Sequence, residues 1–370
     1  MKRVLLINGS SKPLKCGVGY YGDILAHELA KSCDIQLLTT SGLGDEKNIA
    51  GLHHTDNWKI SSLPKIIKII RSVNPNVVHI QYPAVGYGRQ LGINLLPLCL
   101  RFLANKTPVV VTLHEYYGSA MLGKIRNIIT VFAAKKIIVS NQYDKDALPG
   151  FFQKKSSIIP IGHTFSPSAK NRAAYDTYIA SVGLSTTKPV IAYFGFVNPS
   201  KGLDVLVRSA TKINAQILIL ADLSVSNTYH NKLLSDIKIA NEQGATIHVA
   251  GFLNDTMLSQ ILHECTLFAL AQPLPLTAKS STAIVAAEHG LVIVSTAAKN
   301  PIYNLPYVGG KNSILLHDMT EHMFTKACND IINDPKKLQN LKKNLPDLTA
   351  NFKWSSISKK HIVLYDTVMR

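Results

Sequence analysis

Short apolar runs alternate with amphipathic stretches along the first half of the chain. The apolar runs are rich in β-branched residues and are bounded by turn residues, which is typical of buried strands. They cover residues 4–7, 35–38, 77–80, 109–113, 137–139 and 158–161. Helical patterns separate most of these runs, and the alternation predicts a parallel sheet with helices on both faces.

A second series of the same kind begins at Val190, after a polar stretch around residues 166–185 that we interpret as a linker. Its predicted strands are residues 190–194, 216–220, 245–249, 267–269, 291–294 and 313–316, and helical patterns follow to the end of the chain. The sequence therefore predicts an α/β protein with two Rossmann-like domains. We place them at residues 1–170 and 171–350, with a C-terminal helix at residues 351–370 that packs back on the first domain.

Composition restricts the class of protein. A chain of 370 residues with 46% hydrophobic and 17% charged residues is globular and long enough for two domains. The apolar run after Met1 is too short for a signal peptide, and residues 91–104 are too short to span a bilayer. Five scattered cysteines without Cys-x-x-Cys spacing argue against a disulfide framework or a structural zinc site. We therefore expect a cytoplasmic protein with reduced thiols.

The charge is strongly basic and unevenly distributed. The formal net charge is +17, and residues 1–170 hold a surplus of about 12 positive charges. Such a surplus favours an anionic partner or surface. Residues 63–71 and 95–106 carry cations and aliphatic side chains at helical spacing, so each is either an amphipathic helix at an anionic membrane or an ordinary half-buried helix. No recognised nucleic-acid motif is present, which disfavours nucleic acid as the partner.

The strand at residues 190–194 is followed by a loop from Gly195 to Gly202 and by a helix that begins near Leu203. Lys201 stands where this loop becomes the helix. There its ammonium group and the free backbone N–H groups could hold one anion, such as a phosphate. The alternative is an ordinary solvated lysine.

The segment GVGYYG at residues 17–22 matches the pattern G-x-G-x-x-G of dinucleotide-binding turns. However, eight residues separate it from the first strand, and the second strand ends in Thr39-Thr40 rather than in an acidic residue that could bind a ribose. NAD is therefore disfavoured. A glycine-rich loop that opens a helix from Tyr20 still lets the backbone approach an anionic ligand closely, so Gly17 is a candidate contact.

Two further segments carry candidate chemistry. His114-Glu115 follows the strand at residues 109–113, at the carboxyl end where open α/β sheets bind ligands; the alternative is a histidine that merely caps the strand. Ser280 to Thr282 are natural N-cap residues for a helix at residues 283–289. We expect the N–H groups of this helix and Lys201 to face one interdomain cleft, where two helix starts would hold a diphosphate.

The motifs and their order resemble glycosyltransferase family 4. They are KCGVGY at residues 15–20, VVHIQYP at 77–83, VTLHE at 111–115, IIPIG at 158–162, FGFVNPSKG at 194–202, HVAGF at 248–252 and AAEHGLV at 286–292. The resemblance covers nearly the whole chain. It implies the GT-B fold, with two Rossmann-like domains facing a central cleft, a nucleotide-sugar donor on the second domain and an acceptor on the first. It also implies retention of the anomeric configuration, without a cofactor or a bound metal.

The resemblance also implies roles for single residues. It places His114 by the transferred sugar and Lys201 on the diphosphate, and these two are the expected catalytic residues. The expected donor-binding residues are Gly17, Phe196, Lys201, Gly251, Phe252, Thr277, Lys279, Ser280, Ser281 and Thr282. The expected acceptor-binding residues are Lys15, Gly17, Tyr20 and Glu115.

The chain departs from the family pattern at three positions. Phe196 stands where the family usually has an arginine, and the two carboxylates of the family's Glu-x7-Glu motif fall at Thr277 and Val285. We expect Lys279 to restore the positive charge that Phe196 lacks.

The expected function is a retaining, metal-independent glycosyltransferase that moves a sugar from a nucleotide sugar to a lipid-linked or membrane-surface glycan. Its place would be the inner face of the cytoplasmic membrane, in the synthesis of a bacterial-type surface polysaccharide such as a lipopolysaccharide or capsule. The alternative is a non-catalytic protein of the same fold that binds sugar nucleotides or glycans.

Overall fold

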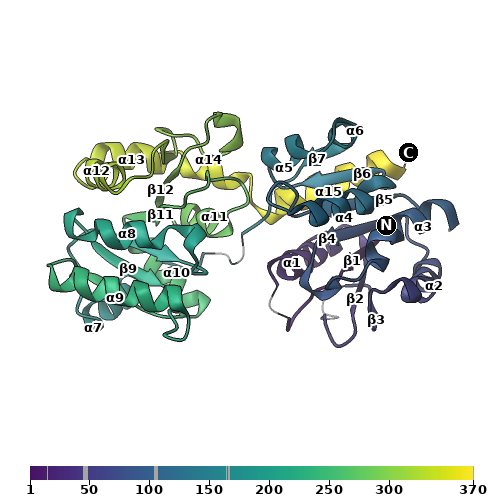
Figure 1. Ribbon diagram of the computed structural model, residues 1–370, viewed down its shortest axis with the longest axis horizontal. Helices are drawn as coiled ribbons and strands as arrows, with labels where there is room; N and C mark the ends of the chain where they lie inside the picture. Colours follow the sequence, from purple (N-terminus) through teal and green to yellow (C-terminus); the bar gives the residue numbers. More distant parts are fainter. Residues whose placement is uncertain (15, 45–48, 104–106, 164, 166, 370) are drawn as a thin grey trace. The chain divides into compact units, whose positions relative to one another are not determined.

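The computed structural model describes the chain except for residues 15, 45–48, 104–106, 164, 166 and 370. The chain forms two compact units (Figure 1): one combines Met1–Gly162 with Lys353–Arg370, and the other is His163–Phe352. The sequence predicts divisions after residues 170 and 350, whereas the observed units divide after Gly162 and after Phe352.

The first unit is built on a parallel sheet of seven strands in the order β3-β2-β1-β4-β5-β6-β7. The first strand, β1, lies third in this order and pairs with β2 on one side and with β4 on the other. The strands are β1 (Arg3–Asn8), β2 (Asp34–Thr40), β3 (Gly51–Thr55), β4 (Val77–Tyr82), β5 (Val109–Leu113), β6 (Lys136–Val139) and β7 (Ser156–Ile158). The predicted parallel α/β architecture is thereby confirmed for this unit.

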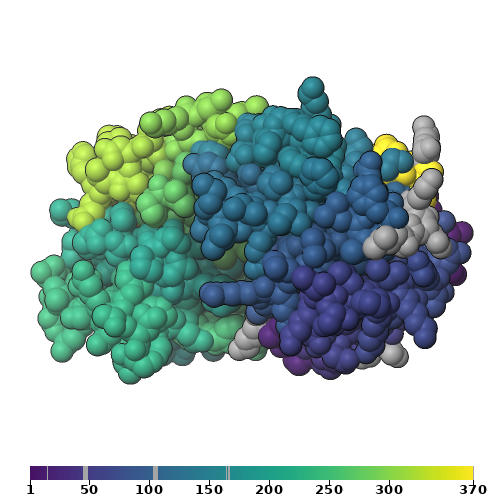
Figure 2. All heavy atoms as spheres, turned by 45° about the vertical axis from the view of Figure 1, so that its right-hand side comes forward, coloured from purple at the N-terminus to yellow at the C-terminus, as the bar shows by residue number. Residues whose placement is uncertain are grey.

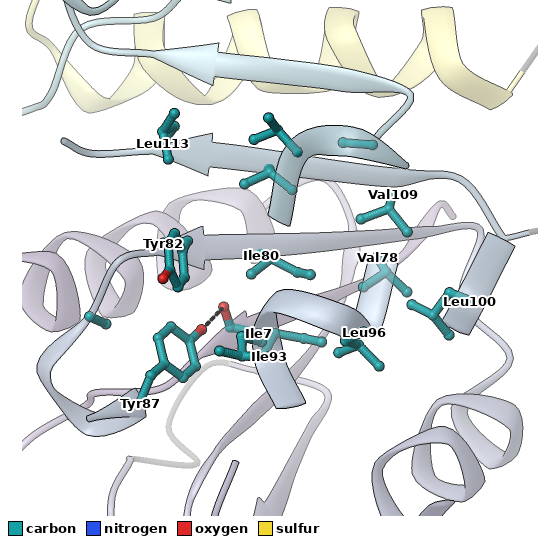
Figure 3. Packing of buried hydrophobic residues seen from close by; sticks show 14 of the residues in the cluster. Ile7, Val78, Ile80, Tyr82, Tyr87, Ile93, Leu96, Leu100, Val109 and Leu113 are labelled. Atoms are coloured by element: carbon teal, nitrogen blue, oxygen red, sulfur yellow. Dashed lines mark hydrogen bonds between the residues drawn. The ribbon is translucent and has the colours of Figure 1, made fainter. Parts of the chain in front are cut away.

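Two hydrophobic clusters cover the two faces of this sheet, because successive side chains of a strand point to opposite faces. Ile7, Ile80 and Val111 belong to the cluster that includes α2, α3 and α4 (Figure 3). Leu6 and Val110 belong to the cluster formed with α1 and α15. The helices of this unit are α1 (Gly17–Ala30), α2 (Leu63–Val73), α3 (Gly92–Leu103), α4 (Met121–Phe132), α5 (Gln142–Ala147), α6 (Gly150–Lys154) and α15 (Trp354–Met369).

Of the two basic, aliphatic segments of the first unit, residues 63–71 lie in α2 and residues 95–103 lie in α3, while residues 104–106 lie outside the described residues. In α2, Ile66 and Ile70 are buried in the core while Lys65 is exposed. In α3, Leu96 and Leu100 are buried in the same cluster. Both helices therefore turn their aliphatic faces to the sheet, as ordinary half-buried helices do. None of the helices in the described part of the chain is long and apolar enough to cross a membrane.

The second unit has a parallel sheet of six strands in the order β10-β9-β8-β11-β12-β13. These strands are β8 (Val190–Phe194), β9 (Gln216–Leu220), β10 (Ile247–Val249), β11 (Leu267–Leu270), β12 (Val292–Thr296) and β13 (Ser313–Leu316). The helices are α7 (Arg172–Ser181), α8 (Leu203–Ser209), α9 (Thr228–Glu242), α10 (Asp255–Glu264), α11 (Ser281–Glu288), α12 (Glu321–Ile332), α13 (Pro335–Lys343) and α14 (Leu345–Ala350). The architecture predicted for the second half of the chain is confirmed as well.

Two segments of the first unit and one segment of the second unit differ from the sequence prediction. The strand β3 was not predicted, because its sequence GLHHT carries little apolar signal. The strand predicted at residues 158–161 lies at Ser156–Ile158 instead. The interpretation of residues 166–185 as a linker is wrong, because this stretch contains α7, whose Tyr175 and Ile179 are buried.

Candidate functional site

Asn8 ends β1 at the carboxyl edge of the first sheet and organises the loop that follows. Its side chain is fully buried, and Nδ2 donates hydrogen bonds to the carbonyl of Gly19 at 3.1 Å and to Oδ1 of Asp23 at 3.2 Å. The hydroxyl of Ser11 donates to the same Asp23 oxygen at 2.7 Å, and the backbone N–H of Lys12 donates to Oδ2 at 3.1 Å. Burial raises the pKa of Asp23, and the hydrogen bonds, which act in the opposite direction, offset only part of this effect. One carboxylate on α1 thus fixes the described part of the loop.

The glycines of this loop have different physical roles. A Cβ atom at Gly19 would lie 2.8 Å from the carbonyl oxygen of Ser10, so the packing of α1 against the loop excludes a side chain there. A Cβ atom at Gly17 would meet nothing within 4 Å, and Gly17 is exposed at the first position of α1 rather than ahead of a helix that begins at Tyr20. Tyr20 is half-buried, and Lys15 lies outside the described residues.

His114 directly follows β5 and is buried at the same edge of the sheet. Its Nε2 lies 2.9 Å from Oε1 of Gln81. Because an amide oxygen only accepts hydrogen bonds, His114 Nε2 carries the hydrogen and donates it. The ring of Tyr21 packs edge-on against the imidazole, with a centroid distance of 5.0 Å. The hydrogen bond to Gln81 and the packing of Tyr21 therefore fix the orientation of the His114 imidazole.

A line of buried polar side chains continues from Gln81 to the C-terminal helix. Nε2 of Gln81 lies 3.2 Å from Nε2 of His79, and Nδ1 of His79 lies 2.7 Å from the hydroxyl of Tyr365 in α15. Burial, together with the nearby His361 and His114, lowers the pKa of His79 well below its ordinary value. This line of side chains, Gln81, His79 and Tyr365, was not predicted from the sequence. The available signal was the alternation in β4, where positions 79 and 81 are polar and share one face.

Glu115, an expected acceptor contact, shapes the loop after β5. Its Oε1 accepts a hydrogen bond from the N–H of Gly118 at 3.1 Å, and its carbonyl accepts one from Asn127 Nδ2 at 2.8 Å. Asp144, which the sequence analysis also missed, is buried and accepts from the N–H groups of Tyr116 and Tyr117 at 2.9 and 2.8 Å. The carboxylates of Glu115 and Asp144 therefore both accept backbone hydrogen bonds from the loop after β5 and fix its conformation.

In the second unit, the loop after β8 follows the sequence prediction closely. Asn198 accepts the N–H of Ser200 with its side chain and the N–H of Lys201 with its carbonyl, both at 3.0 Å. The short 3₁₀ turn η3 (Pro199–Lys201) ends at Gly202, whose φ is +69°. A Cβ atom at Gly202 would lie 1.8 Å from the carbonyl oxygen of Ala271, so this loop passes directly against the end of β11. Lys201 is half-buried, and burial lowers the pKa of its ammonium group.

The start of α11 lies beside the same loop. A Cβ atom at Gly195 would be 2.7 Å from Cγ2 of Thr282, so the backbone after β8 touches the first turn of α11. Ser280 occupies the predicted N-cap position, but its side chain makes no capping hydrogen bond. Its backbone N–H instead donates to the carbonyl of Thr277 at 3.1 Å, which closes a turn before the helix. The first N–H groups of α11 are therefore not occupied by a side-chain cap.

The remaining expected donor contacts lie in the same unit. Lys279 and Ser281 are half-buried residues in and after the turn that precedes α11. Phe196 is exposed on the loop after β8. Val285 is completely buried, so an apolar side chain fills the place of the second family carboxylate.

The pair expected at the nucleotide base lies after β10. Gly251 has a φ of +72°, and Phe252 is exposed. The N–H of Phe252 donates to Oδ1 of Asp222 at 2.8 Å, which ties the loops after β9 and β10 together. Asp222 was not among the predicted residues. In the described part of the chain, no group of three or more His, Cys, Asp or Glu side chains has an arrangement that could hold a metal ion.

Comparisons with known proteins agree on the fold. No protein-family model matches the chain, and no curated protein matches it. Among solved structures, HepE of Anabaena in complex with UDP has a TM-score of 0.76 at 15% sequence identity, with 99% of this chain and 100% of that chain covered. A glycosyltransferase from Rickettsia africae has a TM-score of 0.75 at 16% identity, with 100% and 99% covered. WaaG, a glycosyltransferase involved in lipopolysaccharide biosynthesis, has a TM-score of 0.64 at 12% identity, with 99% of each chain covered. The chain therefore has the GT-B fold over its full length.

Proposed function

We propose that this protein is a glycosyltransferase that takes its sugar from a nucleotide sugar. The observation that supports the proposal is the contact of Gly195, in the loop that leads from β8 to Lys201, with Thr282 in the first turn of α11, whose N–H groups have no side-chain cap. Full-length likeness to HepE, which has been solved with UDP and with UDP-glucose, supports the same assignment.

The chemistry of the transfer explains why such a segment is needed. Cleavage of the bond between the anomeric carbon and the leaving oxygen builds negative charge on the departing diphosphate. Fixed cations and N–H groups at that position stabilise the transition state more than the ground state. In this proposal Lys201 and the first N–H groups of α11 bind the diphosphate, and Lys279 supplies the second positive charge in place of the arginine that Phe196 replaces. Hydroxyls of Thr277, Ser280, Ser281 and Thr282 complete the donor contacts.

The first unit contributes the remaining groups. His114, held by Gln81 and Tyr21, contacts the transferred sugar, while Gly17, Tyr20 and Glu115 contact the acceptor. The acceptor hydroxyl attacks on the face that the diphosphate leaves, and a diphosphate oxygen takes its proton, so the anomeric configuration is retained without a metal ion. The proposed acceptor is a lipid-linked glycan at the inner membrane face. The basic first half of the chain and the likeness to WaaG support this class of acceptor.

The first experiment is a thermal-shift screen against nucleotide sugars, followed by an assay of donor hydrolysis with and without EDTA. A ligand that binds only the folded state raises the melting temperature, so the screen identifies the donor. We expect Lys201→Ala and His114→Ala to lower turnover by about 100-fold or more, while Lys232→Ala, at an exposed lysine of α9, leaves turnover unchanged. Near-normal turnover in either site variant removes that residue from the mechanism.

A non-catalytic nucleotide-sugar-binding protein is the second candidate. The absence of both family carboxylates, at Thr277 and Val285, favours it. The same assay separates the two, because a donor that raises the melting temperature without any release of free sugar identifies a binding protein.

A further inference from the structure

The loop between β11 and α11 touches the loop after β8 at both of its ends. At the start, a Cβ atom at Gly202 would lie 1.8 Å from the carbonyl oxygen of Ala271. At the end, a Cβ atom at Gly195 would lie 2.7 Å from Cγ2 of Thr282 in the first turn of α11. We name residues 271–280 the donor loop, because several of the proposed donor-binding residues lie in it. Its backbone therefore decides how the two segments that we propose to bind the diphosphate are spaced.

Two buried side chains, at the end of β12 and in the loop after it, hold the donor loop. Thr296 is the last residue of β12, and its hydroxyl donates a hydrogen bond to the carbonyl of Gln272. Asn304 lies in the loop after β12, and its Nδ2 donates to the carbonyl of Leu276 at 2.7 Å. This loop reaches the surface around residue 300 (Figure 2), whereas Asn304 is turned inward and is only 2% exposed. The two bonds fix the start and the middle of the donor loop.

The amide group of Asn304 has hydrogen-bond partners for both its nitrogen and its oxygen. Besides the bond to Leu276, Nδ2 lies 3.3 Å from the carbonyl oxygen of Thr296, and Oδ1 accepts the N–H of Ala298 at 2.7 Å. A carboxylate here would turn an oxygen toward two carbonyl oxygens, and an aliphatic side chain would remove a hydrogen bond from each of the three groups. An amide of this length therefore suits all three backbone groups at once.

The backbone at Leu276 determines which side chains of the donor loop reach its outer side. Leu276 and Ala278 are buried, whereas Thr277 and Lys279 are half-buried. Burial thus alternates along this segment, with two apolar side chains anchored in the core. A shift of the backbone at Leu276 would displace Thr277 and Lys279 together.

We propose that Asn304 is a positioning residue for donor binding, whose side chain holds the donor loop in the shape that binds the diphosphate. The inference rests on the proposed function and deepens it, because the buried Asn304 acts through the backbone of Leu276. A loop that is already held in its bound shape loses less conformational entropy when a ligand binds. Without this bond, part of the binding free energy is used to order the loop, and the affinity for the donor falls.

The first test is a comparison of KM and kcat for donor hydrolysis. The probe is UDP-glucose, or the nucleotide sugar that raises the melting temperature most in the screen. We expect Asn304→Ser to raise KM at least about tenfold, while kcat stays within about threefold of the wild type because the bound donor orders the loop. Thr296→Val removes the hydroxyl bond to Gln272 and keeps the shape of the side chain, so KM should rise by a smaller factor. Thr296→Val replaces Asn304→Ser in every measurement if the latter does not fold.

The matched control is the neighbouring residue of β12. Ser295 is fully buried, and its hydroxyl donates at 2.7 Å to the carbonyl of Leu270, which ends β11 ahead of the donor loop. Ser295→Ala therefore also loses a buried hydrogen bond and should unfold at a lower urea concentration, but its KM should stay within about twofold of the wild type. An equal rise of KM in Ser295→Ala and Asn304→Ser overturns the proposal, because lost stability would then explain both.

Hydrogen exchange followed by mass spectrometry tests the donor loop without any ligand. The N–H of Leu276 donates to the carbonyl of Thr296 at 2.9 Å, so its exchange reports opening of the loop. In Asn304→Ser the peptide of residues 273–281 should exchange at least about tenfold faster than in the wild type. In Ser295→Ala it should exchange at the wild-type rate. Unchanged exchange of this peptide in Asn304→Ser overturns the proposal.

The two measurements distinguish this inference from the proposed function. A wild-type protein that neither binds nor hydrolyses nucleotide sugars overturns the proposed function, and with it the role of Asn304 in donor binding, even where exchange shows that Asn304 holds the loop. Donor hydrolysis by the wild type, together with an unchanged KM in Asn304→Ser, overturns the positioning role alone and leaves the glycosyltransferase in place.

Discussion

Lys201 is half-buried in the free protein, and burial lowers the pKa of its ammonium group. The group therefore loses its charge at a lower pH than an ordinary lysine, whose pKa is about 10.4. We expect the affinity for UDP to decline as the pH rises from neutral to about 10, because the cation that we propose to bind the diphosphate is lost. Lys201→Arg should keep its affinity across this range, since arginine stays charged. Lys201→Met should bind weakly without this decline. Calorimetric titration with UDP at several pH values measures all three, and a flat profile in the wild type would contradict the assignment.

Gln81 connects two histidines, because its amide oxygen faces His114 Nε2 at 2.9 Å and its amide nitrogen faces His79 Nε2 at 3.2 Å. Gln81→Leu leaves both ring nitrogens without this partner, and the imidazole of His114 loses its orientation. We expect the turnover of the donor to fall about 10- to 100-fold, while the affinity for UDP is unchanged because Lys201 and the start of α11, which we propose to bind the diphosphate, lie in the second unit. Tyr365→Phe breaks the line only at its far end, so its effect on turnover should be smaller. Equal turnover in Gln81→Leu and the wild type would limit Gln81 to a structural role.

At the scale of elements, the loop between β8 and α8 depends on one backbone position. Gly202 combines a φ of +69° with a neighbouring carbonyl oxygen that would lie 1.8 Å from any Cβ atom. Gly202→Ala should therefore lower the free energy of unfolding by at least about 3 kcal/mol and weaken UDP binding, because the loop that carries Lys201 must move. The control is Gly183→Ala: Gly183 has a similar φ of +73° but open space around it, and should cost only about 1 kcal/mol. Urea unfolding and UDP titration measure both variants, and equal losses of stability would show that the backbone conformation alone matters.

Some strands and helices were predicted from the sequence with their observed bounds and others were not predicted at all, for a physical reason. The strands β5, β8 and β9 were predicted with their observed bounds, because each is a mostly apolar run that is buried throughout in a parallel sheet. The strand β3 lies at the edge of its sheet and carries two histidines, and α7 buries only Tyr175 and Ile179, so neither had a strong periodic apolar signal.

At the scale of the whole molecule, each unit contains a buried histidine that stays neutral. Burial lowers the pKa of His361 in the first unit and of His289 in the second unit to about 4. The unfolded chain takes up these protons near pH 6.5, so between about pH 6.5 and pH 4 it binds protons that the folded chain excludes. The free energy of unfolding should therefore fall on acidification, by about 2 kcal/mol for each histidine at about pH 5. Urea unfolding at neutral pH and at about pH 5 measures the loss.

The variant His361→Gln isolates one of these contributions. Its amide can still donate to the carbonyl of Ile357, which lies 2.8 Å from His361 Nδ1 in the wild type, but it does not titrate. The variant should lose about 2 kcal/mol less than the wild type over the same change of pH. A wild-type protein that gains stability on acidification, or a variant with the same acid loss as the wild type, would contradict this account.

The order of residues along the chain was sufficient to predict the two series of strands and helices. It also placed His114 directly after a predicted strand and Lys201 where a loop becomes a helix. These features depend on neighbouring residues, whose apolar spacing and glycines are visible along the chain. Only the tertiary structure decided which distant groups meet. The line from His114 to Tyr365 joins residues of β4, of the loop after β5 and of the C-terminal helix, and Gly195 after β8 meets Thr282 in the first turn of α11. The exposure of Leu122 and Ile125 on α4 is also a tertiary fact, because the sequence shows that a helix has two faces but not which of them the sheet covers.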